Sequence, residues 1–215
     1  MIYNPMDSVP FIGINRHRIG IDGIGVTTLA CFHGCSLRCR YCLNHRCLDP
    51  EEGMRRLTPQ ELYDHCSIDN LYFVATGGGV CFGGGEPLLR MDFIEAFRNL
   101  CEHNWHLTAE TALSVPRDAV QRAAAVIDDF IIDIKDCNDD IYRRYTGRSN
   151  ELTMGNLRWL VDTIGPDRMT VRVPLIPNYN TPEDTDRSVE TLKAMGITHL
   201  DRFQYTLRKE PSPQP

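Results

Sequence analysis

Six short apolar segments alternate along the chain with segments of helical periodicity, and this alternation restricts the fold more than any other feature. The expected strands are Val26–Phe32, Gly79–Phe82, Trp105–Glu110, Phe130–Ile134, Thr170–Pro174 and Leu200–Tyr205. Strands separated by helices form parallel βαβ units with right-handed crossovers. We therefore expect an α/β fold, a partial (β/α)6 barrel of parallel strands that is shorter than the complete eight-fold barrel.

The helical segments between these strands carry recognisable start signals. Thr58, Pro59 and Glu61 predict a helix start with a capping box, and a second Thr-Pro pair, Thr181-Pro182, precedes the last helix. The other expected helices are Met91–His103, Arg117–Val126, Asp139–Tyr145, Glu151–Ile164 and Glu183–Met195. In such a fold the chemistry belongs at the carboxyl ends of the strands.

Composition excludes several classes of protein. The net charge is −6 with no long basic run, which argues against nucleic acid as a partner. Residues 1–10 do not resemble a secretion signal, and the apolar segment Val126–Ile134 is interrupted by three aspartates, so we expect no membrane span. Nine cysteines in a chain without a leader indicate reduced thiols and a cytoplasmic protein, not a disulfide framework.

Three of these cysteines, Cys35, Cys39 and Cys42, form a C-x3-C-x2-C loop directly after the first expected strand. Three thiolates can hold a [4Fe–4S] cluster and leave one iron open to a ligand, whereas electron-transfer clusters use four. The alternative is a zinc site, with a fourth ligand from nearby cysteines or histidines. Cys31 lies in an apolar strand and is expected in the core, and Cys47 lacks a partner at a recognised spacing. The neighbours that could complete a zinc site are Cys31, His33, His45 and Cys47.

Two further motifs follow expected strands. Glycines in the segment Gly83-Gly84-Gly85-Glu86-Pro87 permit close backbone approach to a ligand, and the glutamate could accept hydrogen bonds from an ammonium group. In Asp133-Ile134-Lys135, strand alternation places the two charged side chains on one face. Either motif alone is also compatible with a tight turn or a surface ion pair.

Taken together, the motifs resemble the radical S-adenosylmethionine (SAM) superfamily, and within it the activating enzymes of glycyl radical enzymes, of the pyruvate formate-lyase type. The resemblance includes the cysteine loop and the glycine-rich segment. It also includes Glu110-Thr111, Asp133–Trp159 and Arg172–Asn180. It implies a core domain over residues 21–207, an N-terminal extension over 1–20 and a flexible tail over 208–215.

The resemblance also implies roles for individual residues. Cys35, Cys39 and Cys42 would ligate one [4Fe–4S] cluster whose fourth iron is chelated by SAM, and Tyr41 would pack near the adenine. The amino group of SAM would bind Gly84, Gly85 and Glu86. Lys135 would reach its carboxylate, and Arg172 would line the same pocket. Glu110, Thr111 and Asp133 match positions around a monovalent cation, although a glutamate here replaces the usual aspartate.

The reaction implied by the resemblance begins when one electron, from flavodoxin or ferredoxin, enters the cluster. SAM is then cleaved to methionine and a 5′-deoxyadenosyl radical, which takes a hydrogen atom from a backbone glycine of a partner glycyl radical enzyme. A second hypothesis is an enzyme of the same scaffold that acts on a peptide or a small metabolite. A third is a non-catalytic metal-binding or redox-sensing protein.

Three positions depart from the family pattern. The family's opening D-G-P-G-x-R motif appears as Asp22–Thr27 without its proline and arginine, and Thr206 occupies a position where the family commonly has histidine. The chain also ends soon after this position. No paired C-x2-C motifs lie between Cys42 and Gly77, so we expect a single cluster.

Overall fold

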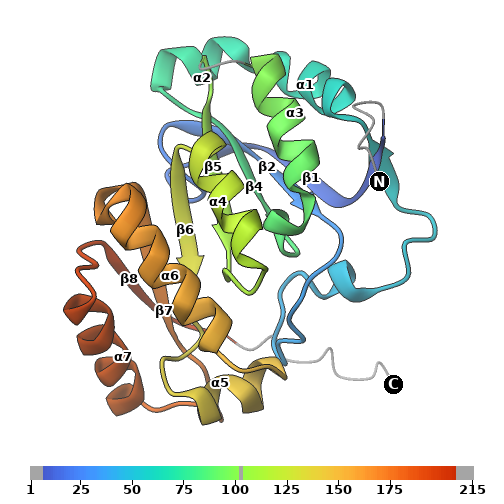
Figure 1. The fold of residues 1–215 in the computed structure, drawn as a ribbon. Coiled ribbons are helices and arrows are strands. Elements are labelled where there is room, and N and C mark those ends of the chain that lie inside the picture. Colours follow the sequence, from blue (N-terminus) through green and yellow to red (C-terminus); the bar gives the residue numbers. More distant parts are fainter. Residues whose placement is uncertain (1–6, 102–103, 207–215) are drawn as a thin grey trace.

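The computed structural model describes residues 7–101 and 104–206, and in these ranges the strands form one mixed sheet. The strand order is β3-β1-β2-β4-β5-β6-β7-β8. Neighbouring strands from β2 through β8 run parallel, whereas β1 is antiparallel to both β2 and β3. The sheet is open, with β3 and β8 at its two edges, and helices cover its outer face (Figure 1).

The strands are β1 Val9–Ile19, β2 Val26–Phe32, β3 Arg55–Leu57, β4 Gly79–Gly84, β5 His106–Thr111, β6 Asp129–Asp133, β7 Met169–Leu175 and β8 Leu200–Gln204. The α-helices are α1 Pro59–Ser67, α2 Asn70–Thr76, α3 Met91–Cys101, α4 Arg117–Val126, α5 Asp139–Thr146, α6 Glu151–Ile164 and α7 Pro182–Ala194. The short 3₁₀ helices are η1 His45–Leu48, η2 Pro87–Arg90 and η3 Pro166–Arg168. No helix in the described ranges has the length and apolar character that crossing a bilayer requires.

All six expected strands are present, each within two residues of its expected ends, and they form the parallel part of the sheet. Two strands were not expected. β1 lies within residues 1–20, for which we expected an extension outside the core, and Phe11 of this strand contacts Phe32 and Phe93. Residues 15–18, in the second half of β1, are polar and largely exposed, so the sequence there lacks the apolar run that indicates a buried strand. The expected tail over 208–215 lies outside the described residues.

The helix starts follow the expected capping chemistry. The Thr58 hydroxyl accepts from the Glu61 amide at 3.2 Å, and the Glu61 carboxylate accepts from the Thr58 amide at 2.7 Å. Thr181 forms the equivalent pair with Asp184 at the start of α7. These reciprocal bonds satisfy amide donors that the first helical turn leaves free.

The core is built from aromatic and aliphatic side chains between the sheet and its helices. Phe32 and Phe82 stack on neighbouring strands, with ring centroids 5.7 Å apart, and Phe97 of α3 packs edge-on against Phe82. This packing fixes the direction of β2 and β4, and therefore the position of the loops that follow them. The cysteine loop follows β2, the glycine-rich segment ends β4, and β5 and β6 end at Thr111 and Asp133. The residues singled out by sequence therefore meet at one end of the sheet.

Candidate active site

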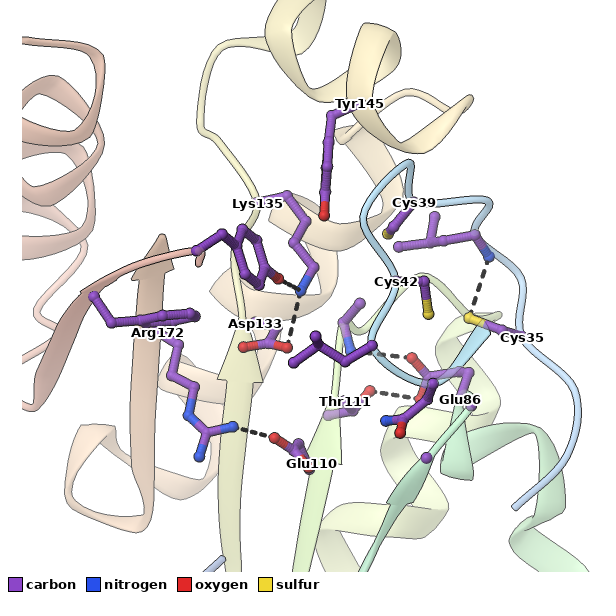
Figure 2. A pocket seen from close by; sticks show the side chains of 18 of the residues that line it. Cys35, Cys39, Cys42, Glu86, Glu110, Thr111, Asp133, Lys135, Tyr145 and Arg172 are labelled. Carbon is purple, nitrogen blue, oxygen red and sulfur yellow. Dashed lines mark hydrogen bonds and ion pairs between the residues drawn. The ribbon is translucent and has the colours of Figure 1, made fainter. Parts of the chain in front are cut away.

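A cavity of about 370 Å³ opens at the carboxyl ends of the parallel strands. It is lined by every site residue expected from sequence except Tyr41, and Figure 2 shows these side chains converging from separate strands and from the cysteine loop. The expected residues in its wall are Cys35, Cys39, Cys42, Gly84, Gly85, Glu86, Glu110, Thr111, Asp133, Lys135 and Arg172.

The cysteine loop is held in place by backbone hydrogen bonds to the end of α5. The amides of Arg38 and Arg40 donate to the carbonyls of Thr146 and Tyr145, at 2.9 and 3.1 Å. Within the loop, the Leu37 amide donates to Cys35 Sγ at 3.4 Å. These hydrogen bonds between protein atoms hold the cysteine loop against α5.

The three thiols differ in their electrostatic surroundings. Burial raises the pKa of the Cys39 thiol to about 11, although the nearby ammonium of Lys135 opposes this shift. A side-chain hydrogen bond with Cys47 and a backbone hydrogen bond from Asn44 lower the pKa of Cys42 to about 6. Cys47 likewise lowers the pKa of Cys35. Cys47 therefore favours the thiolate form, the form that binds metal, at the two thiols it contacts, whereas burial disfavours it at Cys39.

Cys47, one of four residues that the sequence offered as a possible neighbour of the cysteine loop, does contact it. Its side chain is 1% exposed and makes side-chain hydrogen bonds with both Cys35 and Cys42. The Cys47 carbonyl also accepts from the Gly34 amide at 2.9 Å, which ties η1 to the start of the loop. Cys47 is not part of the cavity wall, so it lies behind the two thiols it contacts. Cys31 is buried in the core, as expected.

The glycine-rich segment turns sharply beneath the cysteine loop. Gly84 has a φ of +88°, a conformation that L side chains rarely adopt. A Cβ atom on Gly85 would lie 2.1 Å from the Gly34 carbonyl oxygen, so this contact between the two loops requires glycine. The turn brings Glu86 into the cavity wall with only 1% of its surface exposed.

Glu86 is a buried carboxylate with three hydrogen-bond donors from the protein. It accepts from the Thr111 hydroxyl at 2.6 Å and from the amides of Ala112 and Leu88 at 3.0 and 3.2 Å. Burial raises its pKa, and these three bonds oppose the shift because they stabilise the charged form. The arrangement fixes the carboxylate at the edge of the cavity, where a ligand ammonium could bind.

Lys135 and Asp133 lie on the same face of the chain, as the alternation of the strand predicts. Lys135 Nζ donates to Asp133 Oδ2 at 2.9 Å and to the Tyr205 hydroxyl at 3.1 Å. Burial is the largest single influence and disfavours the charge of Lys135, but the Asp133 carboxylate together with smaller contributions from Tyr205 and Cys39 outweighs it, so the pKa of this lysine lies well above its usual value. The other oxygen of Asp133, Oδ1, is buried without a hydrogen-bond partner among the described residues.

Arg172 and Glu110 form an ion pair across the cavity wall, from β7 to β5. The carboxyl group of Glu110 is also close to Asp133, and burial together with this neighbour raises its pKa. Arg172 donates in addition to the Ile21 carbonyl at 3.2 Å, which connects β7 to the loop between β1 and β2. The positive charge of Arg172 therefore balances a carboxylate of the protein in this structure.

Tyr41 does not line the cavity. Its ring lies 5.6 Å from Tyr179 and 6.2 Å from Tyr145, and its hydroxyl accepts from Asn178 at 3.2 Å. Sequence reasoning did not assign Tyr145 and Tyr205 to the site, although both line the cavity. Tyr205 follows β8 directly, so the rule that chemistry lies at strand ends would have found it. Thr206 is exposed.

The residues of the cavity fit a cluster with one open iron. The three thiols share one wall with a buried carboxylate and an ammonium, and Asp133 Oδ1 is an unused acceptor. Among the described residues, no three histidine, cysteine or acidic side chains are grouped for a single metal ion.

Comparison with known proteins identifies the class of this protein. The family model of the radical SAM superfamily matches residues 29–192, which include the cysteine loop and most of the cavity wall. The chain therefore belongs to the radical SAM superfamily. The pyruvate formate-lyase-activating enzymes of Staphylococcus aureus strains USA300 and NCTC 8325 are 34% identical to it over 171 residues, an alignment that covers 76% of this chain and 67% of theirs. Within the superfamily, the chain falls in the family of these activating enzymes.

Solved structures support the same fold. SuiB of Streptococcus suis, bound to its precursor peptide SuiA, superposes with a TM-score of 0.62 at 15% identity. The superposition covers 83% of this chain and 40% of the SuiB chain. TYW1 with a lysine–pyruvate adduct gives a TM-score of 0.58 at 14% identity, and the superposition covers 84% of this chain and 65% of the TYW1 chain. At these identities the likeness concerns the fold alone. The expected partial barrel of a radical SAM core is confirmed.

Proposed function

We propose that this protein is an activating enzyme that installs a radical on a backbone glycine of a partner glycyl radical enzyme. The observation that carries the proposal is the shared cavity. In it three thiols, a buried carboxylate and a buried ammonium face one space at the strand ends. The membership of the chain in the family of pyruvate formate-lyase-activating enzymes supports the choice of this reaction over that of a peptide- or metabolite-modifying relative.

Cys35, Cys39 and Cys42 would hold one [4Fe–4S] cluster, with the fourth iron left for SAM. Glu86, fixed by Thr111, would accept hydrogen bonds from the amino group of SAM, and Lys135 would donate to its carboxylate. When bound, the cluster and SAM together supply a 5′-deoxyadenosyl radical that abstracts hydrogen. The contribution of the protein is to position these groups and to exclude water from the cavity.

The proposal also includes a reductant and a cellular setting. The reductant is an electron carrier of the flavodoxin or ferredoxin class, and the setting is the cytoplasm, where thiols remain reduced. Of the side chains expected around a monovalent cation, Glu110 is paired with Arg172 and Thr111 donates to Glu86. Asp133 Oδ1, in contrast, has no hydrogen-bond partner among the described residues, so the cation stays a prediction. Tyr41 near the adenine stays a prediction.

The proposal is tested first by anaerobic reconstitution with iron and sulfide, reduction with dithionite, and assay of 5′-deoxyadenosine formed from SAM. Product in the wild type and its loss in Cys39→Ala would support the radical chemistry, and Cys66→Ala, at a buried cysteine outside the cavity, is the matched control. A glycyl radical signal in added pyruvate formate-lyase, detected by electron paramagnetic resonance, would support the activase reaction. Zinc in place of iron after reconstitution would overturn both.

A further inference from the structure

Four exposed arginines lie together beside the cysteine loop, and we call them the arginine surface: Arg38, Arg40, Arg144 and Arg148. Two flank Cys39 in the sequence, and two come from the end of α5 and the turn that follows it. In the described part of the chain, none of the four forms an ion pair with a carboxylate.

Hydrogen bonds place these arginines on one continuous piece of structure. The backbone of the loop pairs with the end of α5 through the amides of Arg38 and Arg40. Arg148, in the turn after α5, donates from Nε to the Ser36 carbonyl at 2.9 Å. Within the loop, Arg38 Nη1 donates to the Cys35 carbonyl at 3.0 Å. The guanidinium groups of Arg38 and Arg148 therefore lie against the backbone at the start of the cysteine loop.

This local positive charge contrasts with the rest of the molecule, whose net charge is −6. Most arginines elsewhere are neutralised by ion pairs with neighbouring carboxylates, including Arg143, which pairs with Asp139 next to the arginine surface. The other paired arginines are Arg16, Arg18, Arg56, Arg98, Arg122, Arg172, Arg187 and Arg202. An acidic partner would thus be repelled by the molecule as a whole and attracted at this surface.

The arginine surface is separate from the route into the cavity. None of its four residues lines the cavity, whereas Leu43, Phe203 and Tyr205 do, and Leu43 is 65% exposed. These side chains, and not the arginines, border the space that a substrate loop would have to enter. A partner held by the arginines stays outside, against the backbone of the cysteine loop.

We propose that the arginine surface is the docking site of an acidic one-electron carrier protein that reduces the cluster. The inference rests on the proposed function and adds the location and the charge of the reductant partner. One electron would pass from the reduced carrier to the cluster. The carrier would lose that electron and the cluster would gain it. No atom is transferred, and a partner on the outer side of the loop leaves the cavity free for SAM and the substrate loop.

The test uses an acidic flavodoxin as the probe and measures its binding to the reconstituted protein by calorimetry at low and high salt. The variant is Arg40→Glu with Arg144→Glu, because within residues 7–101 and 104–206 the Arg40 side chain makes no hydrogen bond and the Arg144 side chain makes one, to the Tyr179 carbonyl at 3.0 Å. We expect the Kd to rise by about tenfold or more at low salt, and its salt dependence to weaken.

Three controls separate the possible outcomes. Arg40→Lys with Arg144→Lys keeps the charge and should bind like the wild type. Lys193→Glu, in the last turn of helix α7, makes the same type of charge change outside the arginine surface and should leave the Kd unchanged. Iron content and dithionite-driven cleavage of SAM should match the wild type in every variant, which separates loss of docking from loss of the cluster.

An unchanged flavodoxin Kd in the double glutamate variant would overturn the proposal. So would normal flavodoxin binding combined with loss of glycyl radical formation under dithionite, since the surface would then bind the substrate enzyme. If the wild type fails to cleave SAM with dithionite, the proposed function fails, and the binding measurement still decides whether the surface attracts the carrier.

Discussion

The Thr111 hydroxyl donates a 2.6 Å hydrogen bond to the buried Glu86 carboxylate, and this bond joins the end of β5 to the turn after β4. Thr111 also accepts from the Leu113 amide at 2.9 Å, so its hydroxyl hydrogen is directed toward Glu86. The carboxylate is therefore held by a side chain that is itself oriented by the backbone. A ligand ammonium would meet an acceptor that needs little reorganisation.

Glu86→Gln should weaken SAM binding, because an amide cannot replace the charge that pairs with an ammonium group. A hydrogen bond to a charged group contributes about 1.5–3 kcal/mol, so the Kd for SAM should rise roughly ten- to a hundredfold. Calorimetry with the reconstituted protein measures the change. Thr111→Val keeps the carboxylate and removes only its donor, and it should have the smaller effect. Equal affinity in wild type and Glu86→Gln would remove this residue from the SAM site.

Lys135→Met should also weaken SAM binding, and it should leave the half-buried Asp133 carboxylate without its ammonium partner. Removing one member of a buried charge pair typically costs about 3–5 kcal/mol in stability. We therefore expect a lower urea midpoint in addition to a higher Kd. The exposed Lys193→Met is the control for loss of a lysine. A Lys135→Met protein that binds SAM normally would show that the carboxylate of SAM has another partner.

Gly85→Ala should destabilise the fold even without a cluster. The added methyl group would lie 2.1 Å from the Gly34 carbonyl oxygen, so the glycine-rich turn and the cysteine loop would have to separate. Overpacking of this kind costs about 1–3 kcal/mol, and urea denaturation of the cluster-free protein would measure it. Gly13→Ala, whose Cβ would meet no atom within 4 Å, is the matched control. Equal midpoints for the two variants would contradict the close contact.

The acid stability of the fold should depend on Asp69, which lies far from the cavity. Hydrogen bonds from Arg16, and to a smaller extent from His17, lower the pKa of this buried carboxylate to about 2. Because the folded-state pKa is below the unfolded value of about 3.9, the stabilisation is present above pH 4 and is lost as the pH falls toward 2. Asp69→Asn should therefore lower the free energy of unfolding at pH 7.

Urea unfolding at pH 7 and at pH 3 provides the comparison for this carboxylate. The difference between wild type and Asp69→Asn should shrink at the lower pH, where the wild-type carboxyl begins to lose its charge in the unfolded state. A difference that stays constant between the two pH values would assign the effect to packing and not to charge.

The parallel strands and most of the cavity could be predicted because their signals are local. Apolar runs such as Phe130–Ile134 mark buried strands, and residues at their ends meet at one edge of the sheet. β1 could not be predicted in this way, because its second half is polar and it is held by pairing with β2 rather than by burial on both faces.

Cys47 and Arg172 show what local patterns leave out. Cys47 reaches Cys35 and Cys42 only because η1 folds back onto the start of the cysteine loop, a contact that spacing in sequence does not encode. Arg172 was expected in the pocket and lies there, but its ion pair with Glu110 depends on how the curved sheet brings β5 and β7 within reach across β6.

The burial of Lys135 makes chemical labelling a probe of the cavity. The chain has only three lysines, Lys135, Lys193 and Lys209, and Lys135 is 7% exposed and bonded to Asp133 and Tyr205. An amine-reactive reagent read out by peptide mass spectrometry would therefore modify Lys193 readily and Lys135 slowly. Protection of Lys135 by a bound small molecule, with Lys193 as the internal standard, would allow ligands of the cavity to be screened without a turnover assay.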